Sequence, residues 1–456
     1  MSTTKSSSTE LPTARQAKKP RGGWKTRLPF YYGWLIVAGG FFSLGITYTV
    51  WYSFTVFYVA LLQEFGWSRA ASAGVFSLFV IVVGVAGTGA GALVDRFGPK
   101  RIVAGGTALL TIGLLACSQI QDLLQFYLMF GIVSAIGLSA TGWVPVVTMI
   151  NRWFSARLGA ALGTASAGIG VGITIMVPVS QMLITQFGWR TAYIILAGVV
   201  FFGVMPITLL VMETRPEDLG LHRDGRAPTP ESETARLAAA AARKPREVNL
   251  KWTTTAWTLG SAVHTYRYWV LAFMMMLANI GTQMIMVHQV AFLVDGGLDK
   301  LLAASIAGMV GMFSIGTKAG WGWMSDRLGR EVTWTIGLSS TLLAITLLIS
   351  TRLAPSPLVL YLYPLVFAFG YGATAPLTPA VVSDLFAGRN FGVIYGSLVI
   401  ANGIGSAIGA WFAGLIFDLT GSYFIAFGLG GVCSLISIAC MWVVAPRLIR
   451  RVPGRC

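Results

Sequence analysis

The chain has 456 residues, of which 55% are hydrophobic and only 11% carry a charged side chain. A soluble protein of this length would have about a quarter of its residues charged, so the composition excludes a soluble globule and indicates a surface that faces lipid. The formal net charge of +16 would also suit a nucleic-acid binder. The basic residues flank apolar runs, however, where they set membrane topology, and we expect no nucleic acid as a partner.

Apolar runs long enough to cross a bilayer, about 20 residues each, recur twelve times along the chain. They lie at 30–54, 70–93, 102–119, 124–149, 157–184, 189–212, 268–294, 301–325, 332–350, 355–383, 391–417 and 422–446. The first run is too long for a cleaved signal peptide, so it is interpreted as a retained span. The sequence therefore predicts an all-α membrane protein with twelve transmembrane helices.

The basic residues predict the orientation. An even number of spans places both termini on one side. Of the 33 basic residues, Arg69, Arg190, Lys300 and Arg352 lie on the opposite side and Lys318 lies inside a span, which leaves 28 on the side of the termini. Because basic residues are enriched on cytoplasmic segments, both termini are expected in the cytoplasm. We expect a multi-pass protein of the plasma membrane, which in a bacterium is the inner membrane.

A polar segment divides the twelve spans into two sets of six. It is charged and contains prolines, and a possible interfacial helix lies near its end. The expected organisation is a cytoplasmic basic tail at 1–28, a six-helix bundle at 29–212, a cytoplasmic linker at 213–267, a second six-helix bundle at 268–446 and a basic tail at 447–456.

The two halves also repeat one another. The strings "GALVDRFG" (91–98) and "GWMSDRLG" (322–329) share Gly-x-x-x-Asp-Arg-x-Gly at an offset of 231 residues. Four glycines of the first half match four of the second at an offset of 233; they are Gly137, Gly159, Gly163 and Gly172 against Gly370, Gly392, Gly396 and Gly405. Two matches at nearly one offset indicate a duplicated six-helix unit.

These features resemble the major facilitator superfamily over essentially the whole apolar chain. The string "GALVDRFGPKR" (91–101) after the second span carries the resemblance, together with the two six-span halves. Within the superfamily, "FYYGWLIVAGGFF" in the first span and "RWFSARLGAALGTASAGIGVG" (152–172) are similar to the monocarboxylate porter and oxalate/formate antiporter group. The resemblance implies two pseudo-symmetric bundles and a secondary active transporter of a small organic anion, which is not an enzyme.

Lys318 is the sharpest candidate for a substrate-binding residue. It lies inside the span 301–325, where a charge costs about 2.5–3.5 kcal/mol on insertion scales. The other spans of the second half carry almost no ionisable groups, so the sequence shows no obvious acidic partner, and an anionic substrate would offset that cost. The alternative is a lysine whose ammonium extends towards the cytoplasmic surface.

The chain departs from the family pattern at two positions. Relatives in the group usually have an arginine in place of Lys318, and the oxalate exchangers add a lysine in the eleventh span, where this chain offers Asn402. One cation and one amide favour a singly charged carboxylate, or a larger acid whose hydroxyl Asn402 can bind, over oxalate. Aromatic residues of three spans are further substrate-binding candidates, with lipid-facing or core packing as the alternative: Tyr48, Tyr52, Trp143 and Tyr371.

His288 and the two Asp-Arg turns are candidates for coupling and conformational control. His288 lies towards the outer end of its span, and histidine titrates near neutral pH, so it could carry a coupling proton. A hydrogen-bonded structural histidine is the alternative. In the superfamily such turns look like latches that favour the outward-open state, and ordinary solvated turns are the alternative; the residues concerned are Asp95, Arg96, Arg101, Asp326 and Arg327.

We therefore expect a monomeric carrier whose partners are a small carboxylate and the lipid bilayer, with proton coupling or anion exchange as the driving force. The four cysteines have no metal-ligand spacing, so neither a metal nor a cofactor is expected. An exporter of apolar drugs or metabolites is the alternative function. Such relatives carry a Gly-Pro motif in the fifth span and acidic residues inside the first half, whereas Pro178 lies well past the glycine cluster here.

Overall fold

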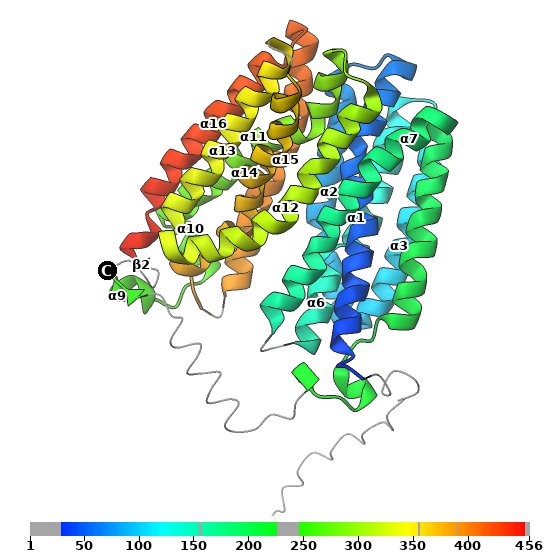
Figure 1. Cartoon of the computed structure of the whole chain (residues 1–456). Helices are drawn as coiled ribbons and strands as arrows, with labels where there is room; N and C mark the ends of the chain where they lie inside the picture. The colour runs from blue at the N-terminus through cyan, green and yellow to red at the C-terminus, as the bar shows by residue number, and fades with distance from the viewer. Residues whose placement is uncertain (1–28, 155–156, 226–245, 354–355, 389, 452–456) are drawn as a thin grey trace, which may run out of the picture.

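The computed structural model describes residues 29–154, 157–225, 246–353, 356–388 and 390–451 (Figure 1). The expected tail at 1–28, the end of the chain from 452 and the middle of the linker lie outside this part. Eleven helices of the described chain are long and apolar enough to cross a membrane. This confirms the all-α membrane architecture that the composition predicts.

The first bundle begins with three long helices and continues with an interrupted fourth crossing. The long helices are α1 (Gly33–Phe65), α2 (Arg69–Phe97) and α3 (Pro99–Cys117). The fourth crossing consists of α4 (Leu123–Phe126), the π-helical segment η2 (Tyr127–Ser134), α5 (Ala135–Thr141) and α6 (Trp143–Trp153). Gly66 ends α1 with a φ of 65°, a left-handed conformation that glycine adopts without strain.

One helix accounts for two crossings. Helix α7 (Leu158–Pro206) has 49 residues and continues into η3 (Ile207–Val211). At 1.5 Å per residue it would be about 74 Å long, more than twice the thickness of a bilayer core. Gly188, with φ 78° and ψ 159°, breaks it into two arms. The eleven helices therefore provide the twelve crossings expected from the sequence.

The second bundle has six uninterrupted helices. They are α11 (Tyr266–Asp295), α12 (Lys300–Leu328), α13 (Arg330–Leu353), α14 (Pro357–Leu385), α15 (Phe391–Thr420) and α16 (Phe424–Val444). Short elements lie in the linker and after α16: η4 (Pro216–Leu219), η5 (Arg223–Gly225), β1 (Arg246–Glu247), α9 (Leu250–Thr253), α10 (Leu259–Val263), η6 (Pro446–Leu448) and β2 (Arg450–Arg451). Strands β1 and β2 pair antiparallel, which joins the end of the linker to the segment after α16.

The helix connections define two faces of the molecule. The linker, the start of α1 and the end of α16 lie on one face, here called the linker face, at the bottom of Figure 1. The short turns after α1, α11 and α15 lie on the other, here called the hairpin face.

At the linker face the Tyr31 hydroxyl donates to the carbonyls of Trp153 and His222 at 2.9 and 3.0 Å, which holds the first part of the linker against the bundle. Partial burial, with Asp224 nearby, raises the pKa of Tyr31 to about 12, so it remains a donor at neutral pH.

The apolar core shows how the two bundles meet. One continuous core, which includes Phe54, Ile173 and Val310, contains residues of both bundles. Two smaller cores each belong to one bundle: one around Trp153 in the first, and one around Trp334 in the second. The bundles thus share a core in one half of the molecule and have separate cores in the other.

Glycines along α12 locate the point where the bundles separate. In the half of α12 nearer the hairpin face, a Cβ atom at Gly311 would lie 2.5 Å from Ile173 Cβ of α7, and one at Gly308 would lie 3.1 Å from Pro178 Cδ. About three turns further along the same face of α12, a Cβ at Gly322 would meet no atom within 4 Å. The bundles therefore pack closely near the hairpin face and diverge towards the linker face (Figure 1).

Candidate functional site

Two hydrogen bonds between α12 and α14 position Lys318. The Thr317 hydroxyl donates to the Ala368 carbonyl at 3.2 Å, and Trp321 Nε1 donates to the Phe369 carbonyl at 2.7 Å. Gly372 of α14 leaves room for the Thr317 side chain, which a Cβ atom there would overlap. These contacts hold the two helices together on either side of Lys318.

The Lys318 ammonium faces an aromatic ring. Its Nζ lies 5.2 Å from the centre of the Tyr371 ring, within the range of a cation–π interaction. The side chain is half-buried, and Lys318 forms no ion pair within the described part of the chain. Within the described residues, the structure thus places a cation without a carboxylate partner seven residues beyond Gly311, where α12 contacts α7 closely.

Tyr371 connects this cation to the other bundle. Its hydroxyl lies 2.7 Å from the hydroxyl of Tyr52 on α1, and one of the two must donate to the other. Both side chains are half-buried. The chain of contacts from Lys318 through Tyr371 to Tyr52 therefore crosses from the second bundle to the first.

Beyond Tyr52, towards the hairpin face, the space between the bundles is filled. A cavity of about 10 Å³ remains there, room for about one water molecule. Its lining comes from α1, α2 and α11: Trp51, Tyr52, Phe54, Thr55, Phe76, Met286 and Val287. The Thr55 hydroxyl donates across the bundles to the Val287 carbonyl at 2.9 Å. Access to Lys318 from the hairpin face is closed in this conformation.

The other three predicted substrate residues lie on α1, α6 and α15. Tyr48 stacks on Trp51 with ring centres 6.2 Å apart. Trp143 begins α6 directly after the backbone break at Gly142 and is 38% exposed. Asn402 is half-buried on α15. Among the described residues, none of these three side chains hydrogen-bonds to Lys318, so their contact with substrate remains a prediction.

His288 lies in a different part of the molecule from Lys318. It is fully buried, and its ring nitrogens contact the Ala410 carbonyl at 2.8 Å and the Tyr423 hydroxyl at 3.0 Å. Since a carbonyl only accepts, Nε2 carries the proton and donates to Ala410, which leaves Nδ1 to accept from Tyr423 in the neutral ring. A role in proton handling remains a prediction.

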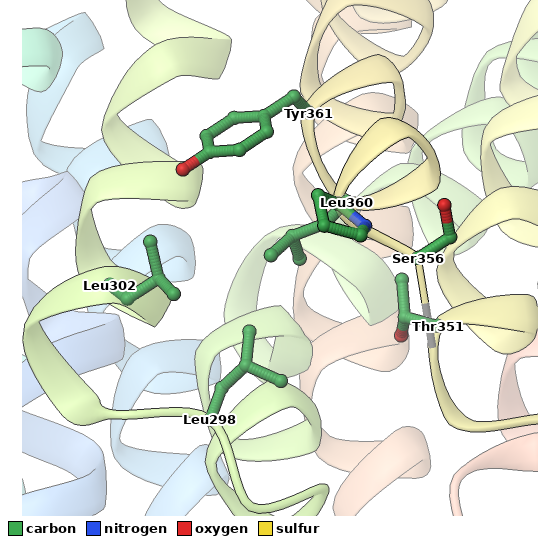
Figure 2. Close-up of a pocket in the computed structure, with 7 residues that line it drawn as sticks. Leu298, Leu302, Thr351, Ser356, Leu360 and Tyr361 are labelled. Atoms are coloured by element: carbon green, nitrogen blue, oxygen red, sulfur yellow. The ribbon is translucent and has the colours of Figure 1, made fainter. Parts of the chain in front are cut away.

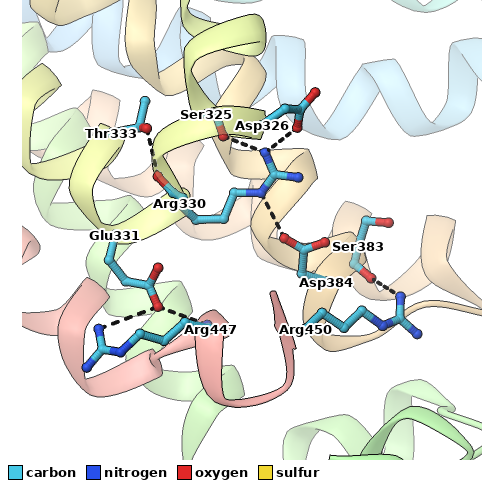
Figure 3. A network of polar contacts seen from close by, with 10 residues as sticks. Ser325, Asp326, Arg330, Glu331, Thr333, Ser383, Asp384, Arg447 and Arg450 are labelled. Atoms are coloured by element: carbon cyan, nitrogen blue, oxygen red, sulfur yellow. Dashed lines mark hydrogen bonds and ion pairs between the residues drawn. The ribbon is translucent and has the colours of Figure 1, made fainter. Parts of the chain in front are cut away.

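The predicted latch residues lie near the linker face and make no contact between the bundles among the described residues. Asp326 pairs with Arg330 at 2.8 Å within the second bundle (Figure 3). The Arg327 guanidinium lies 4.0 Å from the centre of the Trp323 ring. In the first bundle Arg96 and Arg101 are exposed, and the Asp95 side chain lies outside the described part. The latch therefore remains a prediction for a conformation in which the linker face is closed.

A buried ion pair near the turn after α12 was not among the predicted residues. Arg330 Nε donates to Asp384 Oδ2 at 2.8 Å, with side chains only 10% and 7% exposed. Figure 3 shows Arg330 between Asp326 and Asp384. The sequence signal for this ion pair is Asp384, an acidic residue at the end of the apolar run of α14, and the sequence does not identify Arg330 as its partner. The pair joins α13 to the end of α14.

A second hollow lies within the second bundle and is separate from Lys318. It measures about 270 Å³ and lies near the hairpin-face ends of α12, α13 and α14. Its lining is mostly apolar: Leu298, Leu302, Thr351, Ser356, Pro357, Leu360 and Tyr361. In Figure 2 the Tyr361 ring extends away from α14. No charged side chain is among the described residues that line it, so it does not suit an anion.

Comparisons with known proteins identify relatives of the chain. A family model described as the Major Facilitator Superfamily matches residues 40–386 and 271–454. Monocarboxylate transporter 13 of Bos taurus is 27% identical over 418 residues, which cover 92% of this chain and 88% of that protein. Monocarboxylate transporter 12 of Homo sapiens is 26% identical over 457 residues, which cover 96% of this chain and 83% of that protein.

The fold also matches solved structures. A crystal structure of the peptide transporter POT in complex with sulfate superposes with a TM-score of 0.67, covering 91% of this chain and 95% of that one. The sequence identity is 16%, so this similarity concerns the fold alone. It confirms the architecture predicted from the repeats and the span count.

Proposed function

Since the chain belongs to the Major Facilitator Superfamily and is a multi-pass secondary transporter, we propose that its substrate is a small organic acid with a single carboxylate. The observation that carries this proposal is the Lys318 ammonium, which has no ion pair among the described residues and is half-buried where the two bundles separate. A cation that is partly shielded from water and has no counter-charge is costly. A carboxylate entering between the bundles offsets that cost, which an uncharged substrate cannot do.

The surroundings of Lys318 support a monoanion over a dianion. Lys318 is the single charged residue among the proposed substrate residues, and Tyr52, Tyr371, Tyr48, Trp143 and Asn402 are neutral. One ammonium balances one carboxylate and leaves a second one uncompensated. The hydroxyls of Tyr52 and Tyr371 can donate to a carboxylate oxygen or to a substrate hydroxyl. The names of the relatives, monocarboxylate transporters 13 and 12, support the proposal of a singly charged substrate.

The transport cycle that we propose is alternating access by rocking of the two bundles about this site. In this proposal the described conformation, whose bundles diverge towards the linker face, is open on that side, and the excess of basic residues there supports a cytoplasmic location. The state is then inward-open, in a plasma membrane. In the outward-open state the linker face closes, and the Asp95 and Asp326 turns would hold it closed.

The driving force in this proposal is either proton symport or anion exchange. His288 is the proposed proton-handling residue in the first case. Its contacts with Ala410 and Tyr423 lie at the hairpin-face end of the bundles, so it would act on the opening of that face and not on the substrate directly.

Counterflow into proteoliposomes tests the substrate class. The purified protein is reconstituted into proteoliposomes that contain a mixture of unlabelled small monocarboxylates. Uptake of labelled acetate, lactate, pyruvate and oxalate from outside is then measured separately. Uptake of at least one monocarboxylate is expected, with oxalate poorly transported. Uptake of oxalate alone, or of neutral or cationic apolar compounds and no acid, would contradict the proposal and favour an exchanger of dianions or an apolar-compound exporter.

Variants of Lys318 test the residue. Lys318→Gln should lower uptake of the monocarboxylate at least 10-fold, because a hydrogen bond to a charged group contributes about 1.5–3 kcal/mol. Lys318→Arg keeps the charge and should retain part of the activity. The matched control is Lys251→Gln, which removes the charge of an exposed lysine of the linker and should leave uptake unchanged. Normal uptake by Lys318→Gln would remove Lys318 from the site.

The coupling is tested separately from the substrate. Vesicles without internal substrate are given an inward proton gradient at constant membrane potential. Accumulation under these conditions indicates symport, whereas uptake that requires an internal anion indicates exchange.

A further inference from the structure

A carboxylate of the second bundle caps a helix of the first at the hairpin face. Asp418, near the end of α15, accepts from the backbone N–H of Arg69 at 2.9 Å and from that of Ala70 at 2.7 Å, one with each carboxylate oxygen. These N–H groups belong to the first turn of α2, where they have no partner within the helix and where the helix dipole favours an anion. The cap therefore joins the two bundles.

The Arg69 side chain makes further contacts with the second bundle. Its guanidinium forms an ion pair with Asp295 at 2.7 Å and donates to the Tyr423 hydroxyl at 2.7 Å. Its Cζ atom also lies 3.7 Å from the centre of the Phe417 ring. All of these partners belong to the second bundle or its connections, so Arg69 is bound across the interface through both its backbone and its side chain.

The backbones approach closely at the same point. A Cβ atom at Gly414 of α15 would lie 2.7 Å from the Arg69 carbonyl oxygen and 2.9 Å from the Ala70 nitrogen. Only a residue without a side chain permits this distance. The polar contacts and the helix packing therefore coincide at the start of α2.

We propose that Arg69, Asp418, Asp295 and Tyr423 form a lock that holds the hairpin face closed, here called the outer lock. The Asp418 cap, the ion pair with Asp295 and the hydrogen bond to Tyr423 all join Arg69 of the first bundle to the second bundle, so these contacts must break when the bundles part at this face. The Arg69 and Asp295 side chains are 17% and 29% exposed. Water can therefore solvate both groups as the contacts open, which keeps the lock reversible and avoids leaving a buried charge unpaired.

A neighbouring ion pair shows what distinguishes the lock. Glu64 of α1 forms an ion pair with Arg190 of α7 at 2.6 Å and accepts a hydrogen bond from Trp189. This pair also lies at the hairpin face, but all three residues belong to the first bundle. It can stay intact in both conformations and provides the control for charge removal at the same face.

Labelling of a buried cysteine tests the outer lock without any substrate. In a background in which the four native cysteines are replaced, Met286→Cys places a thiol beside the small cavity beyond Tyr52. A membrane-impermeant maleimide is applied from each side in turn, with Lys251→Cys in a parallel sample marking the linker face. Asp418→Asn and Arg69→Gln should each raise the labelling rate from the hairpin face at least 5-fold.

The controls separate opening of the lock from general damage. Glu64→Gln should leave the rate from the hairpin face unchanged. Tyr423→Phe, which removes a single hydroxyl, should raise the labelling rate from the hairpin face less than Asp418→Asn does. This variant replaces the charge variants in the test if those do not fold. Unchanged labelling in Asp418→Asn, Arg69→Gln and Tyr423→Phe, or an equal rise in Glu64→Gln, would overturn the proposal. Because no substrate is added, this result is independent of the proposed substrate class.

Discussion

Lys318 holds its ammonium 5.2 Å from the centre of the Tyr371 ring, and the two residues come from neighbouring helices of the second bundle. An aromatic face attracts a cation by its quadrupole but carries no net charge. The ring thus stabilises Lys318 partly and leaves its charge to be neutralised by another group. In the described conformation this cation lies where the bundles begin to separate.

Variants of Tyr371 should distinguish its ring from its hydroxyl. Tyr371→Phe keeps the ring over Lys318 and loses the hydrogen bond with Tyr52, so we expect the KM for the transported acid to rise a few-fold. Tyr371→Leu loses both contacts and should raise it more than 10-fold. Initial uptake rates at varied substrate concentration give both values. Tyr361→Phe, in the exposed part of α14, is the control and should match the parent protein. Equal KM values for the Leu and Phe variants would show that the ring has no role.

Two glycines of α15 should respond differently to the same substitution. In Gly414→Ala the new methyl group would lie 2.7 Å from the Arg69 carbonyl and force the bundles apart at the hairpin face. Gly403→Ala adds a methyl group that meets no atom within 4 Å. We therefore expect faster labelling of Met286→Cys from the hairpin face in Gly414→Ala and no change in Gly403→Ala. The same rate in both variants would mean that close packing of α15 against Arg69 does not hold this face closed.

The hydrogen bonds of His288 predict a pH dependence of the outer lock. In the neutral ring, Nδ1 accepts from Tyr423, whose oxygen accepts from Arg69. Protonation of His288 makes Nδ1 a donor, so the Tyr423 hydroxyl must donate to another acceptor. Protonation also adds a positive charge near the Arg69 guanidinium. The Tyr58 ring packs perpendicular to the His288 ring, and the nearby carboxylates Asp295 and Asp418 are already bound by Arg69.

Acidification should therefore loosen the lock. Labelling of Met286→Cys from the hairpin face is expected to become faster as pH falls, after correction for the reactivity of a free thiol. His288→Gln can still donate to Ala410 but does not titrate, so its labelling rate should be independent of pH. A pH profile that is identical in the two proteins would exclude His288 as the titrating group.

Removing either partner of Arg330 should affect stability very differently. Asp384 is 7% exposed and Asp326 is 67% exposed, and both bind the same guanidinium. Asp384→Ala leaves Arg330 buried without its enclosed counter-charge and should destabilise the protein by about 3–5 kcal/mol. Asp326→Ala removes a largely solvated partner and should change stability by less than about 1 kcal/mol. Thermal unfolding of the detergent-solubilised protein, followed by tryptophan fluorescence, measures both; equal losses would mean that burial of the pair is unimportant.

The architecture of this protein could be predicted from the sequence because it depends on local quantities. Span length follows from the thickness of the bilayer, and basic flanks and glycine spacing are properties of short segments. The position of Lys318 within an apolar run is of the same kind, since its distance from the ends of that run can be counted in the sequence. The scarcity of acidic residues in the spans of the second half predicted that Lys318 has no carboxylate partner, and no ion pair of Lys318 occurs in the described part of the chain.

Contacts between distant segments were decided only by the tertiary structure. The pairing of Tyr52 with Tyr371 joins residues 319 positions apart, and Asp418 caps a helix that begins 349 positions earlier. Arg69 reads in the sequence as an ordinary basic residue of a short turn. Its role at the interface depends on how two bundles pack, and that packing is set by the summed shape of many side chains, which no short stretch of sequence contains.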